Sequence, residues 1–131
     1  MLPKWHTLLG FLFSYIIYWF TSITIFQASL ILFAAIFIDV DHYTWYVLKK
    51  KDWNFKNAYY TLKNEERMTR KLMIFHTIEF HIFVGLLSLI WAGFFYILIG
   101  MIFHSLIDIA DLTRHNELKY RVFSLTKAMI Y

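Results

Sequence analysis

The sequence predicts an all-α protein: an integral membrane bundle of four transmembrane helices with a cytoplasmic loop and a C-terminal amphipathic helix. Two observations support this fold class. Of its 131 residues, 60% are hydrophobic and 17% are charged, whereas soluble proteins carry about 25% charged residues. Asp, Glu, Lys and Arg are also absent from two long segments, 5–38 and 80–107. A domain of this size cannot bury so much apolar surface in its own core, and a lipid environment removes the difficulty.

The first uncharged segment, 5–38, is too long for one membrane span. As a single helix it would measure about 51 Å at 1.5 Å per residue, and a bilayer core is about 30 Å thick. We therefore predict two helices, 5–20 and 25–46. The turn between them is predicted at Thr21–Thr24, because hydroxyl side chains can bond the backbone groups that a turn leaves free.

A second helical hairpin is predicted in the apolar segment 72–112. It divides into helices 71–91 and 95–112, with the break near Trp91–Gly93. The tryptophans of the chain fall near predicted helix ends, as in the aromatic belts of membrane proteins. All four helices then belong to a single membrane domain, residues 1–131.

Positive charge is concentrated on one side of the predicted bundle. The loop 49–71 contains eight of the 13 basic residues and the tail 113–131 contains four more, whereas the two turns on the opposite side carry no charge. The positive-inside rule places the loop and both termini in the cytoplasm. The tail also repeats apolar residues at helical spacing, at Leu118, Val122, Leu125 and Met129, with basic residues between them. This pattern predicts an amphipathic helix on the membrane surface.

Polar clusters interrupt the apolar pattern at three predicted helix ends, within 39–42, 76–81 and 104–108. The second helix ends, the third begins and the fourth ends on the same membrane face, so the clusters lie at a similar depth. His6 joins them if the first segment is a hairpin. Ionisable groups inside a membrane are costly and usually face a bundle interior or one another. We therefore predict a metal site with these ligands: His6, Asp39, His42, His76, His81, His104 and Asp108.

The chemistry of this ligand set limits which metal ions the site can bind. A divalent cation offsets the repulsion between neighbouring carboxylates. Imidazole suits Zn or Fe and carboxylate suits Mn, so the mixed set predicts Zn, Mn or Fe, as one or two ions. Glu79 or Asp41 remains as a general base, or as a partner that orients the histidines by hydrogen bonding. The alternatives are a hydrogen-bonded structural network and, for Asp41, simple capping of a span at the interface.

Four polar motifs follow one another along the chain in an order that is also found in a known protein family. They are His6-Thr7-Leu8-Leu9-Gly10, Asp39-Val40-Asp41-His42, His76-Thr77-Ile78-Glu79-Phe80-His81 and Gly100-Met101-Ile102-Phe103-His104-Ser105-Leu106-Ile107-Asp108. In this order the chain resembles the YdjM-like family of membrane-bound, metal-dependent hydrolases. It departs from the family pattern at Ile38, where the family has Pro, and at Thr77 and Ile78, where the family has Arg-Gly. The resemblance implies hydrolytic chemistry at a metal site built from these motifs.

The sequence thus predicts a membrane-embedded metal-dependent hydrolase that acts on an amphiphilic substrate, a lipid phosphoester or ester, at the cytoplasmic membrane face. Membrane lipid is the expected partner, and the thin walls of four short helices are compatible with a homodimer. The alternative is a non-catalytic metal-binding or structural membrane protein. A di-iron lipid hydroxylase or desaturase uses HxxxH and HxxHH arrangements, and the six histidines here form neither. No motif supports binding of nucleic acid.

Overall fold

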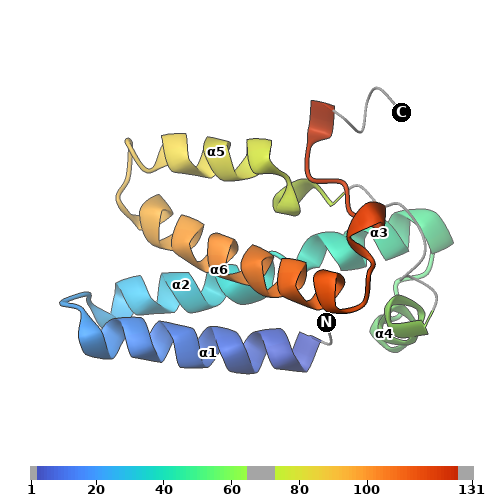
Figure 1. The fold of residues 1–131 in the computed structure, drawn as a ribbon, viewed down its shortest axis with the longest axis horizontal. Helices are drawn as coiled ribbons and strands as arrows, with labels where there is room; N and C mark the ends of the chain where they lie inside the picture. Colours follow the sequence, from blue (N-terminus) through green and yellow to red (C-terminus); the bar gives the residue numbers. More distant parts are fainter. Residues whose placement is uncertain (1–2, 65–72, 127–131) are drawn as a thin grey trace.

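The computed structural model describes residues 3–64 and 73–126, which form helices and connecting segments with no β-strand among them (Figure 1). The prediction of an all-α chain is confirmed. The α-helices are α1 (Pro3–Phe20), α2 (Ile25–Phe37), α3 (Val40–Lys50), α4 (Phe55–Asn64), α5 (Ile78–Leu87) and α6 (Gly93–Arg114), and two short 3₁₀ helices are η2 (Ile74–His76) and η3 (Leu118–Tyr120).

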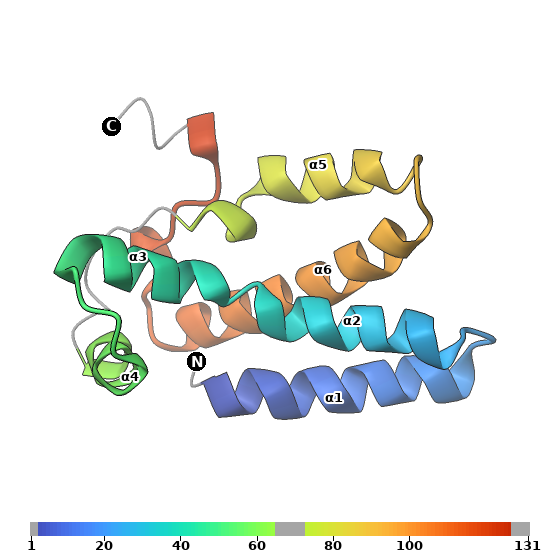
Figure 2. The same ribbon diagram turned by 180° about the vertical axis from the view of Figure 1, so that it is seen from behind.

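The long helices are arranged as two hairpins whose turns lie at the same end of the molecule (Figures 1 and 2). α1 packs against α2, α2 against α6, and α6 against α5. The start of α1, the helices α3 and α4, and the segment after α6 lie at the opposite end. The helix ends that carry the polar clusters therefore meet at that end.

The first hairpin turns where the sequence predicts it. Residues 21–24 connect α1 to α2, and Thr24 is the N-cap of α2. The Thr24 hydroxyl accepts a hydrogen bond from the backbone N–H of Gln27 at 3.2 Å, and the Gln27 side chain accepts one from the backbone N–H of Thr24 at 2.8 Å. This reciprocal capping box satisfies backbone donors that the first turn of a helix leaves unpaired.

The predicted helix 25–46 is interrupted, which corrects the prediction of one continuous helix. α2 ends at Phe37, α3 begins at Val40, and a two-residue turn lies between them. The apolar pattern gives no sign of this turn. It places the Asp39 carboxylate 3.3 Å from His104 Nε2 on α6, so a polar contact across the bundle accompanies the break in the helix.

The second half of the chain also departs from its predicted bounds. α5 covers only Ile78–Leu87, about 15 Å of helix, rather than 71–91. Thr77 has an extended backbone (φ −83°, ψ 152°) and separates η2 from α5. The break predicted near Trp91–Gly93 is present, and α6 includes the predicted helix 95–112.

The predicted loop 49–71 contains a helix, α4. Its first turn is held by Asn54, whose side-chain oxygen accepts hydrogen bonds from the backbone N–H groups of Lys56 at 2.9 Å and Asn57 at 3.3 Å. Asn is among the preferred residues at the start of a helix because its side chain can accept such bonds. Residues 65–71 of the predicted loop lie outside the described residues.

The predicted amphipathic helix of the tail is wrong for residues 115–124. α6 ends at Arg114, and Asn116 adopts the left-handed conformation (φ 57°) that commonly terminates a helix. After η3 the chain runs back along the start of α5, where the backbone N–H of Ile78 donates to the carbonyl oxygen of Phe123 at 3.0 Å. Residues 127–131 of the predicted helix lie outside the described residues.

Small residues allow α1, α2 and α6 to approach closely. A Cβ atom on Gly10 would lie 3.2 Å from the Cβ of Ala35, and one on Gly100 would overlap the backbone carbonyl of Ile31 and lie 3.0 Å from the Cβ of Ala34. Helices in membranes associate through such small-residue contacts, because lipid removes the hydrophobic driving force between them. The close contact of α2 and α6 brings His104 next to the end of α2.

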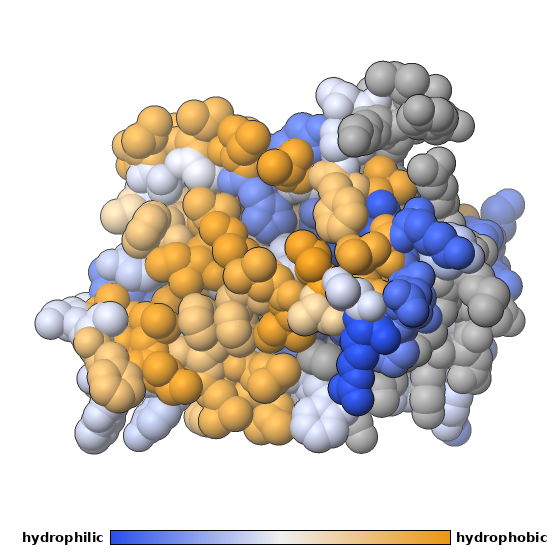
Figure 3. All heavy atoms as spheres, in the orientation of Figure 1, coloured by the Kyte–Doolittle hydropathy of each residue, from blue (hydrophilic) through white to orange (hydrophobic). Residues whose placement is uncertain are grey.

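Much of the surface is apolar. Apolar side chains cover most of the face seen in Figure 3 on the side of the two turns, and hydrophilic ones gather toward the opposite end. Near the turns the side chains of Phe20 and Leu89 are 80% and 84% exposed. Two stretches, Ile25–Lys50 (α2 with α3) and Gly93–Arg114, are long and apolar enough to span a membrane.

Candidate metal centre

A buried cluster of imidazoles and carboxylates lies at the end of the bundle opposite the two turns. α1 supplies one residue, the α2–α3 turn and the start of α3 supply three, η2 supplies one, and α6 supplies two. They are His6, Asp39, Asp41, His42, His76, His104 and Asp108. The side chains of His76 and His104 are 0% and 1% exposed, so their polar atoms depend on partners inside the protein.

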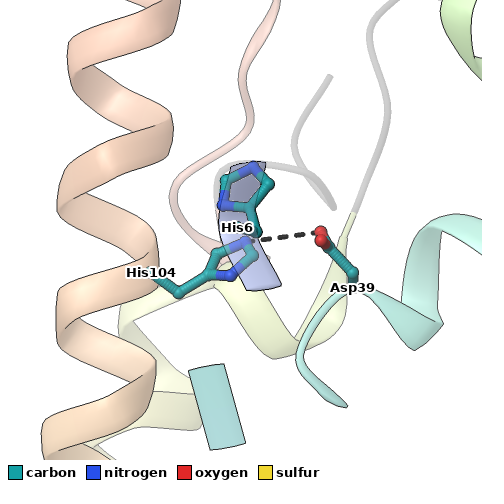
Figure 4. A group of neighbouring side chains, drawn as sticks. All are labelled: His6, Asp39 and His104. Atoms are coloured by element: carbon teal, nitrogen blue, oxygen red, sulfur yellow. Dashed lines mark ion pairs between the residues drawn. The ribbon is translucent and has the colours of Figure 1, made fainter. Parts of the chain in front are cut away.

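The ring of His104 has a defined orientation. Its Nδ1 lies 2.7 Å from the carbonyl oxygen of Ala35. A carbonyl oxygen only accepts, so Nδ1 carries the hydrogen and the Nε2 of the neutral ring carries a lone pair. That Nε2 lies 3.3 Å from Asp39 Oδ1 (Figure 4) and 3.8 Å from Asp108 Oδ2, and it has no hydrogen-bond partner among the described residues. Electron-rich atoms face one another here, which requires a proton or a metal cation between them.

His76 has the same arrangement with a different partner. Its Nδ1 lies 3.1 Å from Asp41 Oδ2, which also accepts a hydrogen bond from the backbone N–H of Phe75 at 3.1 Å. The opposite ring nitrogen, Nε2, lies 3.6 Å from Asp108 Oδ2 without a hydrogen bond. Burial lowers the pKa of His76 to about 4, against the opposing effect of Asp41. The ring is therefore neutral at physiological pH, with a lone pair directed into the cluster.

Asp41 lies where the second of its two predicted roles, orienting a histidine by hydrogen bonding, requires it. A carboxylate that binds one nitrogen of a histidine, leaving the other for a metal, is the usual partner of a metal-binding histidine. Asp41 Oδ1 also lies 3.2 Å from His42 Nδ1. Its carboxylate thus orients His76 and contacts His42, instead of standing free as a general base.

His6 and His42 complete the cluster from two sides. The His6 ring stacks on that of His104, with 4.1 Å between ring centroids, and its Nε2 lies 3.2 Å from Asp108 Oδ1. His42 Nδ1 lies 3.4 Å from Asp39 Oδ1, and both of these side chains are 26% exposed. The Asp39–His42 side is the more open side of the cluster, and the side lined by His76 is closed.

The spacing of these atoms fits a metal ion. Three groups have ligand atoms that all lie within 4.8 Å of one another: His6, Asp39 and His104; Asp39, His42 and His76; His76, His104 and Asp108. A tetrahedral centre with bonds of about 2.0–2.1 Å separates its ligand atoms by about 3.4 Å. The ion-pair distances within these groups run from 3.3 to 3.8 Å and include that value. These buried groups could hold a metal ion, and six of the seven predicted ligands belong to them.

His81, the seventh predicted ligand, does not join these groups. Its Nδ1 lies 2.8 Å from the carbonyl oxygen of Thr77 and its Nε2 lies 3.2 Å from Ser105 Oγ. The prediction treated residues 76–81 as one helix, whereas the chain changes direction at Thr77. His76 then faces the cluster, while His81 faces the α5–α6 contact.

Glu79, the other candidate base, contacts the tail instead of the cluster. Its carboxylate accepts hydrogen bonds from Ser124 Oγ at 2.5 Å, from the backbone N–H of Leu125 at 3.1 Å and from that of Thr126 at 3.5 Å. A carboxylate with several donors of its own holds a segment in place. The structure therefore gives Glu79 the role of fixing the tail against α5.

We expect Glu79→Ala to release the tail without loss of metal-binding capacity. The substitution removes the acceptor for three tail residues, so amide hydrogen exchange at 121–126 should become faster. Hydrogen exchange followed by mass spectrometry measures this, with metal content measured on the same sample. Unchanged exchange in the tail, or loss of the metal, would contradict the assignment.

Arg121 is the cluster residue that the sequence analysis missed. Its Nη1 donates a hydrogen bond to Asp108 Oδ2 at 3.1 Å. The tail was interpreted as a surface helix, which directs its basic residues toward lipid head groups. No spacing pattern connects a single arginine in a tail to a carboxylate thirteen residues earlier, so only the fold reveals the contact.

Comparisons with known protein families, with curated proteins and with solved structures find no match to this chain. The similarity to the YdjM-like family stays a prediction from the order of the motifs. The function is therefore inferred from the geometry and chemistry of the cluster.

Proposed function

We propose that the protein is a membrane-embedded, metal-dependent hydrolase that acts on an amphiphilic phosphoester or ester at the cytoplasmic membrane face. The observation that supports it best is the pair of buried imidazole nitrogens, His76 Nε2 and His104 Nε2, which face Asp108 Oδ2 at 3.6 and 3.8 Å without hydrogen bonds. Buried polar atoms are rarely left without partners. A divalent cation satisfies both nitrogens and the carboxylate at once.

A bound Zn, Mn or Fe ion would acidify water and stabilise negative charge on the substrate. The six clustered residues would hold it, and Asp41 keeps the His76 ring in the orientation that binding needs. Asp39 and His42 lie on the more open side. Whichever of the two does not bind the metal could accept a proton from water there, since a general base has to reach both solvent and the reacting atoms.

The membrane setting is part of the proposal. The cluster lies at the end of the bundle away from the two uncharged turns, and α3, which ends in Lys49 and Lys50, extends from that end. The positive-inside rule then places the cluster, and both termini, on the cytoplasmic side. The exposed apolar side chains of the helices face lipid, and α5, which is about 15 Å long, relies on its contact with α6 and the turn beyond it to cross. An amphiphile in the inner leaflet would bring its head group to the depth of the cluster.

The experiment is elemental analysis of the detergent-purified protein, combined with a screen of lipid phosphoesters and carboxylic esters in mixed micelles. We expect one or two Zn, Mn or Fe ions per chain, together with hydrolysis of at least one substrate class that stops when a chelator removes the metal and resumes when the metal is restored. A protein that binds no divalent metal at micromolar concentrations would refute the proposal.

A purely structural metal is the second candidate. The closed side of the cluster favours it, because the side chains of His76, His104 and Asp108 are at most 8% exposed and structural sites have all positions filled by protein. The same experiment separates the two. Bound metal that raises the thermal unfolding temperature, with no turnover of any substrate, indicates the structural function.

A further inference from the structure

Arg121 extends the cluster beyond its metal-binding groups. Its guanidinium makes one hydrogen bond to the described residues, from Nη1 to Asp108 Oδ2. The Nε atom is buried and has no hydrogen-bond partner among them. Guanidinium groups have five N–H donors in a fixed planar arrangement, so most of the donors of this side chain, which is only 11% exposed, remain available.

Backbone hydrogen bonds hold the chain in place at Arg121 and at the residues that follow it. The backbone N–H of Arg121 donates to the carbonyl oxygen of Leu118 at 3.1 Å, which closes η3. Two residues later, the carbonyl oxygen of Phe123 accepts from the backbone N–H of Ile78 at 3.0 Å. Glu79 then holds the following residues. The chain is thus attached to α5 just beyond Arg121, which holds its side chain against Asp108.

The edge of the guanidinium formed by Nε and Nη2 is the one that Asp108 does not use. Two N–H groups on one edge of an arginine match two oxygens of a phosphate or a carboxylate, and such paired bonds are both strong and directional. A contact with Asp108 alone does not account for this edge, because a buried donor without an acceptor is costly. An oxyanion bound beside the metal ligands would supply the missing acceptors.

We propose that Arg121 binds an anionic phosphate oxygen of the substrate, so that the enzyme acts on phosphoesters and not on neutral carboxylic esters. This inference rests on the proposed function and specifies its substrate. The guanidinium touches the substrate directly and lies beside Asp108, so it would hold the phosphate next to the metal-binding side chains. A neutral ester has no second charged oxygen to match that edge.

Binding of inorganic phosphate to the detergent-purified, metal-loaded protein tests the inference, measured by isothermal titration calorimetry. We expect Arg121→Ala to weaken phosphate affinity by about tenfold or more, because hydrogen bonds to charged groups are among the strong ones. Arg121→Lys should recover only part of the affinity, since an ammonium has no planar edge. Lys119→Ala is the matched control: it removes an exposed positive charge two residues away and should leave the affinity within about twofold.

Metal content, measured on each variant, separates substrate binding from a structural role. Arg121→Ala should keep its metal. Equal phosphate affinity in the wild type and Arg121→Ala, or absence of phosphate binding to the wild type, overturns the inference. So does loss of metal in Arg121→Ala that Arg121→Lys restores together with full phosphate affinity, because Arg121 would then act only by positioning Asp108.

A substrate panel distinguishes this inference from the proposed function. Hydrolysis of neutral esters with no hydrolysis of phosphoesters contradicts the role of Arg121 and leaves the hydrolase intact. Phosphate binding that depends on Arg121, with no turnover, contradicts the hydrolase and leaves the anion site intact. Phosphatidic acid in mixed micelles, compared with inorganic phosphate, shows whether the phosphate belongs to a lipid head group: tighter, Arg121-dependent binding of the lipid supports a lipid source, and equal binding supports a free phosphate.

Discussion

His104→Ala is expected to remove the bound metal and the hydrolytic activity together. His104 belongs to two of the three possible metal-binding groups, so an ion held by either of these two groups would lose a ligand. Loss of a residue that only orients a ligand typically lowers metal affinity or activity about 10- to 100-fold, and we expect loss of a direct ligand to exceed about 100-fold. Elemental analysis and the rate with the best substrate measure the two effects.

His115→Ala is the control for this prediction. His115 follows the same helix, its side chain is 36% exposed, and its contacts are with Asp111 instead of the cluster. It should keep both metal and activity. Full metal content in His104→Ala would contradict metal binding at the two groups that contain His104, and loss of metal in His115→Ala would show that the measurement reports damage to α6 in general.

Gly100→Ala is expected to destabilise the fold and to empty the metal site. A methyl group at this position would overlap the backbone carbonyl of Ile31, which belongs to α2 and cannot move aside as a flexible side chain could. Overpacking of this kind costs about 1–3 kcal/mol or more, which exceeds the gain of about 1 kcal/mol from replacing a helical Gly with Ala. His104 lies one helical turn further along α6, so separation of α2 and α6 moves its Nε2 away from Asp39.

Gly85→Ala is the matched control, because a methyl group there would meet Leu98 Cδ2 at 3.5 Å, an ordinary contact. It should be neutral or slightly stabilising. The thermal unfolding temperature in detergent, followed by circular dichroism, and the metal content measure both variants. A Gly100→Ala protein with unchanged unfolding temperature and metal content would show that α2 and α6 do not depend on this close approach.

The sequence alone predicted the two helical hairpins and the end of the bundle at which the polar residues meet. Two uncharged apolar segments, each too long for one helix across a bilayer, require a turn within each. Once both turns lie at one end, Asp39, His76 and His104 have to meet at the other. The turn at Thr21–Thr24 could also be predicted from the sequence, because a helix cap depends on residues that are close together in the chain.

Only the tertiary structure decided which polar residues face the cluster. His81 and Glu79 follow His76 closely in sequence, yet the extended backbone at Thr77 turns both of them away from it. Arg121 lies in a tail that looked amphipathic and nevertheless contacts Asp108. Hydrophobic spacing reports which helix face is apolar, and it contains no information about a change of chain direction or about contacts between distant segments. Those depend on which buried donors and acceptors can be satisfied together once the helices have packed.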